Sequence, residues 1–206
     1  MSIPGLFRGT PARKRVRKIF TALCGAVLAV LVFTAFTRKE AAPMTNHDFF
    51  RSLDFDDGLR VVTETFDRFP LQYGTTLGLD GNPQIRPIEF KFEQDGVLYF
   101  DTVEFYRSYA ELQAHPYLQL CVCDPETMTY VRVGGKVNFT KDPAIVDRCF
   151  AESPVLTSQF GERRDVVVAY YLTEVWAEFN SFTADLPYRS YQLPNRFDAA
   201  AAEANG

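Results

Sequence analysis

The chain has 206 residues, of which 47% are hydrophobic and 15% aromatic, a composition that excludes a disordered polypeptide and suffices for one globular domain of ordinary size. The net charge of −4 is unevenly distributed, because residues 1–43 carry eight basic side chains and one acidic one while the remainder is strongly acidic. An acidic domain repels a phosphate backbone, which excludes a nucleic-acid-binding function.

The first predicted element is an apolar helix. Residues 19–37 contain no charged side chain and follow a basic cluster at residues 13–18. At about 1.5 Å of rise per residue this segment nearly crosses a hydrocarbon core of about 30 Å, which predicts a transmembrane helix or signal anchor with the basic cluster in the cytoplasm. Ala41-Ala42 is a weak cleavage site. The alternative is translation from Met44, which would give a cytoplasmic protein without this segment.

Two helices are predicted next. Thr45 and Asp48 form a capping pair before an apolar run, which indicates a helix start. A second helix is predicted from Leu59 to Phe69, and Pro70 ends it.

The central part of the chain predicts strands. Two turn signals, Asp80-Gly81-Asn82-Pro83 and Gln94-Asp95-Gly96, lie between runs rich in β-branched and aromatic residues, as in hairpins. Between them, Arg86 to Phe92 alternates apolar and polar positions, which predicts one half-buried strand. The remaining predicted strands lie at 97–100, 118–122, 130–137, 166–171 and 175–179, and the remaining helices at 108–114 and 142–152, the last with Asp142 as its cap and Pro143 in its first turn.

The cysteines indicate free thiols. Cys121 and Cys123 share one face of a predicted strand and cannot be joined without distortion, so we predict a buried apolar pair. Neither His47 nor His115 lies at ligand spacing from them, so no metal site is predicted. Free thiols indicate a reducing compartment. A transmembrane helix at 19–37 with the basic cluster in the cytoplasm would place the following domain outside the cytoplasm, so the two predictions conflict.

Four short sequence segments, each of a common type, occur in a characteristic order: LDGNPQIRPIEF, GVLYFDT, YAELQAHPYLQLCV and YVRVGGKV. In this order and spacing, the region from about Thr45 to Ser181 resembles the pyridoxamine 5′-phosphate oxidase-like family of flavin-binding split β-barrels. The resemblance implies a mainly β fold with short helices, a split β-barrel domain at 44–185 and a C-terminal tail at 186–206. It also implies a homodimer whose subunits together bind flavin mononucleotide (FMN).

The resemblance further implies a set of cofactor-binding residues. The strand arginine beside the flavin corresponds to Arg86, and the hydroxyl residue ending the next strand corresponds to Thr102. Where the family has a Ser-Arg-Lys motif, this chain has Tyr106-Arg107-Ser108, so the lysine that would bind the phosphate is missing. The complete predicted set is Arg86, Pro87, Ile88, Thr102, Arg107, Ser108 and Tyr130.

Each arginine also has an alternative interpretation, in which its role is structural. Arg107 would be an exposed side chain paired with Glu104 or Glu111, and Arg86 would cover apolar surface with its stem at a strand end. For Arg107, the two interpretations differ in charge: a cation free to meet a phosphate, or one already paired with a carboxylate.

No nucleophile–base pair is recognisable, so no catalytic side chain is predicted and any chemistry would come from the cofactor. The expected function is that of an FMN-dependent oxidoreductase acting on a small molecule. The expected partners are the flavin, the substrate, a second copy and, through residues 19–37, a membrane. The alternative is a non-catalytic or flavin-free binding module of the same fold that holds haem or a deazaflavin.

Overall fold

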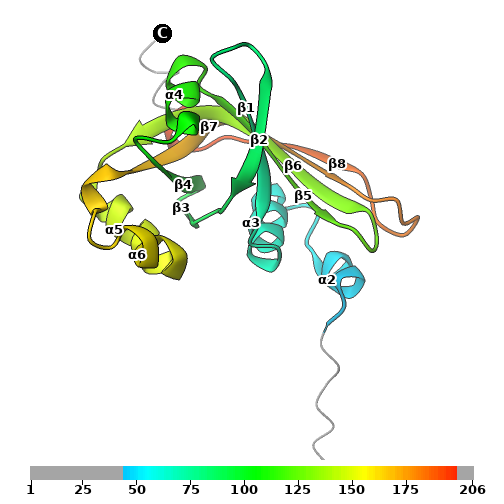
Figure 1. The fold of residues 1–206 in the computed structure, drawn as a ribbon. Helices are drawn as coiled ribbons and strands as arrows, with labels where there is room; N and C mark the ends of the chain where they lie inside the picture. The colour runs from blue at the N-terminus through cyan, green and yellow to red at the C-terminus, as the bar shows by residue number, and fades with distance from the viewer. Residues whose placement is uncertain (1–43, 199–206) are drawn as a thin grey trace, which may run out of the picture. The chain divides into compact units, whose positions relative to one another are not determined.

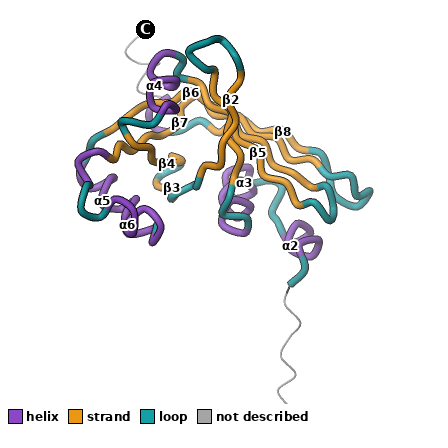
Figure 2. Tube along the Cα trace, in the orientation of Figure 1, coloured by secondary structure: helices purple, strands orange, loops and turns teal. Residues whose placement is uncertain are grey.

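The computed structural model describes residues 44–198, which form an antiparallel sheet accompanied by short helices (Figures 1 and 2). The elements are α2 (Asn46–Ser52), α3 (Gly58–Arg68), β1 (Gln72–Leu77), β2 (Pro83–Ile88), β3 (Phe92–Gln94), β4 (Val97–Val103), α4 (Arg107–Ala114), β5 (Tyr117–Asp124), β6 (Thr129–Thr140), α5 (Pro143–Glu152), α6 (Pro154–Phe160), a 3₁₀ turn (Arg164–Val166), β7 (Val167–Asn180) and β8 (Arg189–Leu193). Within residues 44–198, no helix is long and apolar enough to cross a membrane. The apolar helix predicted at 19–37 lies outside the described residues.

The predicted helix caps are confirmed. The Thr45 hydroxyl accepts a hydrogen bond from the Asp48 amide at 3.1 Å, and the Asp142 carboxylate accepts one from the Ala144 amide at 2.9 Å. Each bond satisfies an amide that the helix itself leaves unpaired. The second helix begins one residue before its predicted start, with Asp57 as its cap.

The strands follow the order β2-β1-β5-β6-β7-β4-β3, every pair is antiparallel, and β8 joins on β7. Both predicted hairpin turns are present. Between β3 and β4, Asp95 and Gly96 have φ of 53° and 81°, a left-handed pair that matches the twist of a tight hairpin. Because β4 pairs with β7 and not with β5, the next strand in the chain, β7 lies between two parts of the sheet. One part contains β2, β1, β5 and β6, and the other contains β4 and β3.

Two groups of buried side chains stabilise these parts. The larger lies between α2, α3 and the strands β4 to β7, and includes Phe50, Val62, Phe66, Phe100 and Phe179. The smaller, which includes Phe92, Tyr99 and Phe150, packs β3, β4 and β7 against α5 and α6. Figure 1 shows α5 and α6 together, separate from α3.

The prediction of one strand from Arg86 to Phe92 is wrong. The ladder stops at Ile88, and β3 starts at Phe92. Gln72, which is fully buried, explains the break: its side-chain oxygen accepts the Phe90 amide at 2.8 Å, and its nitrogen donates to the Phe69 carbonyl at 2.7 Å. A side chain thus satisfies a backbone amide that would otherwise need a ladder partner.

The two closing strands predicted at 166–171 and 175–179 are one strand, β7. It continues through residues 172–174 because a register shift between Gly134 and Lys136 of β6 accommodates a bend at Glu174, whose φ is 53°. Strand β8 lies within the segment expected as a C-terminal tail and pairs with β7 from Val175 to Phe179. Helix α6 was not predicted.

Candidate functional site

A cavity of about 460 Å³ brings together five of the seven predicted site residues. They are Arg86, Pro87 and Ile88 from β2, Thr102 from β4 and Ser108 from α4. Apolar side chains from α4, α6 and the sheet complete the wall, among them Val103, Leu112, Val155, Leu156, Phe160 and Tyr170. Polar and charged side chains lie among these apolar ones, and a cavity of this size that combines the two is the usual form of a small-molecule site.

Arg86 reaches its place because β2 pairs with β1 and sets it opposite Gly74, on the same face as Thr76. Its Nη1 donates to Thr76 Oγ1 at 2.8 Å and its Nη2 donates to Glu111 Oε2 at 2.6 Å. Thr76 Oγ1 in turn donates to the same Glu111 oxygen at 2.7 Å. The guanidinium is therefore fixed by a carboxylate, and three elements (β1, β2 and α4) meet at this point.

Glu111 is fully buried, with a side-chain exposure of 0%. Burial by itself would raise its pKa, but hydrogen bonds from Thr76 and Arg86 and the charges of Arg86 and Arg107 outweigh that effect and lower the pKa. The second oxygen, Oε1, lies 2.9 Å from Arg107 Nε in an ion pair whose angle does not meet hydrogen-bond geometry. Glu111 is thus an ionised carboxylate that both arginines share.

Arg107 does not line the cavity. Its side chain is 58% exposed and lies between Glu111, four residues later on α4, and Asp80, whose Oδ2 is 3.5 Å from Nη2. The alternative reading of Arg107, an exposed arginine paired with Glu111, is therefore confirmed in geometry. Beside it, the hydroxyls of Thr102 and Ser108 lie 3.4 Å apart at the cavity wall.

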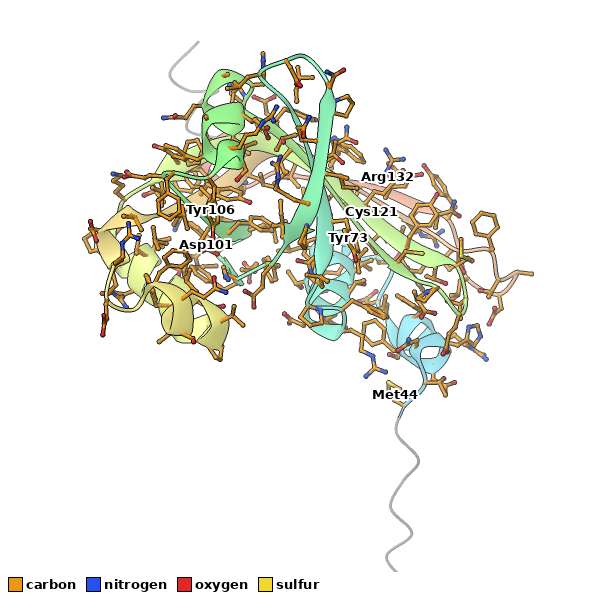
Figure 3. All side chains as sticks on the ribbon, in the orientation of Figure 1. Met44, Tyr73, Asp101, Tyr106, Cys121 and Arg132 are labelled. Carbon is orange, nitrogen blue, oxygen red and sulfur yellow. The ribbon has the colours of Figure 1, made fainter. Side chains whose placement is uncertain are left out.

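Tyr130, the remaining predicted site residue, lies elsewhere. It belongs to the open face, a surface of β1, β2, β5, β6 and β7 that comprises Tyr73, Ile85, Tyr117, Cys121, Cys123, Tyr130, Arg132 and Trp176. In Figure 3, Tyr73, Cys121 and Arg132 lie in a row on this face, while Asp101 and Tyr106 lie together at the cavity. Within one chain, Tyr130 and the cavity are separate.

The open face also corrects the prediction for two cysteines. Cys121 is half-buried and Cys123 is exposed, so they are not a buried pair; both are free, as is the buried Cys149. They border a second cavity of about 490 Å³, which is lined by none of the predicted site residues. Burial raises the pKa of both open-face thiols, so neither is an activated nucleophile.

Sequence reasoning missed a charged cluster in the wall of the first cavity. Lys91 is almost completely buried, and its Nζ lies 3.0 Å from Asp101 Oδ1 and also contacts Glu89. Glu89 accepts a further hydrogen bond from the Ser153 hydroxyl at 2.9 Å. Burial raises the pKa of Asp101 in spite of Lys91. The alternation of residues 86–92 predicts that Lys91 faces solvent. The two phenylalanines that flank it in the sequence EFKF are the feature that could have indicated its burial.

The sheet and its cavity define the class of the protein: a mainly antiparallel sheet with short helices, consistent with a split barrel, that has a cavity between β2, β4, α4 and α6. A family model described as pyridoxamine 5′-phosphate oxidase matches residues 63–169, about half of the chain. The chain therefore belongs to the pyridoxamine 5′-phosphate oxidase family. No curated protein matches the sequence.

Several solved structures are similar in fold. A NimC/NimA family protein from Clostridium acetobutylicum has a TM-score of 0.58 and 17% identity, covering 71% of this chain and 99% of its own. A protein of the pyridoxinephosphate oxidase family from the same organism, related to general stress protein 26, has a TM-score of 0.55 and 14% identity, covering 68% and 97%. A haem-binding protein from Mycobacterium smegmatis has a TM-score of 0.50 and 11% identity, covering 60% and 52%. At these identities the likeness concerns the fold alone.

The cavity fits one end of FMN better than the other. Its apolar wall with the hydroxyls of Thr102 and Ser108 is suited to a flat ring with polar edges. The phosphate end requires cations, and the two arginines predicted for that purpose are both engaged by Glu111. The residues present therefore fit a flavin ring and do not fit its phosphate.

Proposed function

We propose that this protein is a flavin-binding oxidoreductase of the split-barrel type that acts on a small molecule. The observation that supports the proposal is the meeting of Arg86, Pro87, Ile88, Thr102 and Ser108 at one cavity, although they come from three separate elements. A bound flavin ring, of FMN or of a related flavin, would supply the electron transfer. The side chains of the cavity would bind and orient the ring.

The proposed roles follow from the chemistry of each wall. Ile88, Leu112 and Tyr170 exclude water from the ring, while the hydroxyls of Thr102 and Ser108 meet its polar edge. Burial raises the pKa of the Asp101 carboxyl, which lies in the cavity wall, so Asp101 is the group that would exchange a proton with a ligand here.

The absorption spectrum of the purified full-length protein after incubation with excess FMN and removal of free ligand tests this proposal. We expect flavin bands, because the cavity wall protects a ring from solvent. A Soret band after incubation with haem, without retention of flavin, would instead favour the haem-binding alternative. Absence of any bound chromophore would leave a binding module of another kind and contradict a flavin function.

We also propose that two copies associate through the open face. Ile85 is 72% exposed there, and Tyr73 and Tyr117 are exposed beside it, an apolar surface larger than scattered single residues. Tyr130 lies on the same face, so association is the arrangement by which it could reach the cavity of another copy. The family resemblance implies the same assembly.

Light scattering of the full-length protein at micromolar concentration should give the mass of a dimer. Ile85→Asp should shift it to a monomer with an unchanged circular dichroism spectrum, because a charge placed at an apolar interface remains unpaired while an exposed position in the monomer tolerates it. A wild-type mass equal to one chain would contradict association.

A further inference from the structure

We infer that the affinity of this cavity for a flavin does not depend on the flavin's phosphate, because Glu111 occupies the arginines as an internal anion. The inference rests on the proposed flavin function and specifies it further. It assigns to Glu111 the role of setting ligand specificity: uncharged or ring-only flavins bind as well as phosphorylated ones.

The contacts of Arg86 carry the first step. Both terminal nitrogens are in use, Nη1 toward Thr76 at 2.8 Å and Nη2 toward Glu111 at 2.6 Å. Further N–H groups of the guanidinium remain, but its charge is already balanced by a carboxylate that has no exposure to water. A phosphate bound at Arg86 would therefore add a second anion beside the buried, ionised Glu111, and the repulsion between the two would offset its attraction to the arginine.

Two other cations near the cavity, Arg107 and Lys91, are neutralised in the same way. Arg107 lies 2.9 Å from the second oxygen of Glu111 and 3.5 Å from Asp80. Lys91 lies between Asp101 and Glu89. Three cations therefore face four carboxylates, and none of these three is unpaired. The lysine that the family would show in place of Ser108 is absent, so it does not compensate.

An ordinary charge-assisted contact to a phosphate raises affinity about ten- to hundredfold. That gain is expected where the cation is free beforehand. Here the charge of each arginine is already balanced by Glu111, so a phosphate meets no net positive charge and gains little. Ring burial, which riboflavin and FMN share, therefore determines the affinity.

The direct test compares the dissociation constants of FMN and riboflavin for the full-length wild-type protein, measured by quenching of flavin fluorescence. We expect the two constants to agree within about threefold. FMN binding more than about thirtyfold tighter would overturn the inference while leaving the flavin function intact. This comparison requires no variant, so it decides the question whether or not any substitution folds.

Glu111→Gln tests the residue assigned. The amide keeps the shape and the bond from Thr76 but removes the charge, so the arginines become free for an anion, and FMN should gain about tenfold or more over riboflavin. Glu64→Gln is the matched control, since Glu64 pairs with Arg60 at the same 2.6 Å on α3, outside the cavity wall. It should leave the FMN-to-riboflavin ratio unchanged. An unchanged ratio in Glu111→Gln would also overturn the inference.

A third measurement separates this inference from the flavin function. Inorganic phosphate at millimolar concentration should raise the melting temperature of Glu111→Gln but not that of the wild type or of Glu64→Gln. If neither flavin binds the wild type, the flavin function fails, and this melting shift still shows whether Glu111 blocks an anion site. Equal stabilisation of all three proteins by phosphate would contradict the role of Glu111.

Discussion

Replacing Glu111 with alanine should lower the free energy of unfolding by about 3–5 kcal/mol, the usual cost of removing one partner from a buried ion pair. Arg86 would keep its charge without the carboxylate at 2.6 Å, and Thr76 would lose the acceptor of its hydroxyl. Urea denaturation followed by circular dichroism measures the change. A loss of less than about 1 kcal/mol, typical of surface pairs, would show that Glu111 does not fix the arginines.

The chain contains a matched control for this prediction. The Arg60–Glu64 pair on α3 has the same nitrogen–oxygen distance of 2.6 Å but lies at the surface, so Glu64→Ala should barely change stability. Acid titration offers a second readout. Because the folded-state pKa of Glu111 is lowered, its stabilisation is complete above the pKa of the unfolded state and disappears as pH falls through the folded value. Glu111→Ala should therefore be less sensitive to acid than the wild type.

Phe100→Ala should also cost about 3–5 kcal/mol, because it removes a fully buried ring from a packed core and leaves a cavity. Phe100 stacks on Tyr170 with ring centroids 5.4 Å apart, and Tyr170 forms part of the cavity wall. The substitution should consequently weaken ligand binding as well as stability. Urea denaturation and flavin titration of the same sample measure both effects.

Phe182→Ala is the control for this substitution, since Phe182 is 75% exposed and its removal should change stability by no more than about 0.5 kcal/mol. Equal losses for the two variants would mean that Phe100 does not belong to a tightly packed core.

Local chemistry accounts for the elements that sequence reasoning placed correctly. The cap of Thr45 and the turn at Asp95-Gly96 depend on neighbouring residues only, so their patterns predict them. The break between β2 and β3 depends instead on Gln72, a side chain from another strand that reaches the Phe90 amide. Alternation of polar and apolar residues contains no information about such a bond.

The candidate site likewise has features that the sequence predicts and features that depend on contacts between distant residues. The resemblance places Arg86, Thr102 and Ser108 because strand order brings them to one cavity. It does not reveal that Glu111 neutralises Arg86 across 25 positions of sequence, since pairing between distant residues is a property of the folded chain. Lys91 was missed for the opposite reason: its polar position in the pattern suggested solvent, and the fold supplied two carboxylates.

The central position of β7 has a consequence for synthesis of the chain. Strands β3 and β4 are adjacent in sequence and form a hairpin, but the partner of β4 from Tyr99 to Val103 is β7, which begins only at Val167. At roughly 5–20 residues per second, the ribosome needs several seconds to make the intervening segment. During that interval the apolar edge of β4 has no strand beside it and is exposed to pairing with other nascent chains. The yield of folded protein should therefore depend on what shields this edge until β7 has been made.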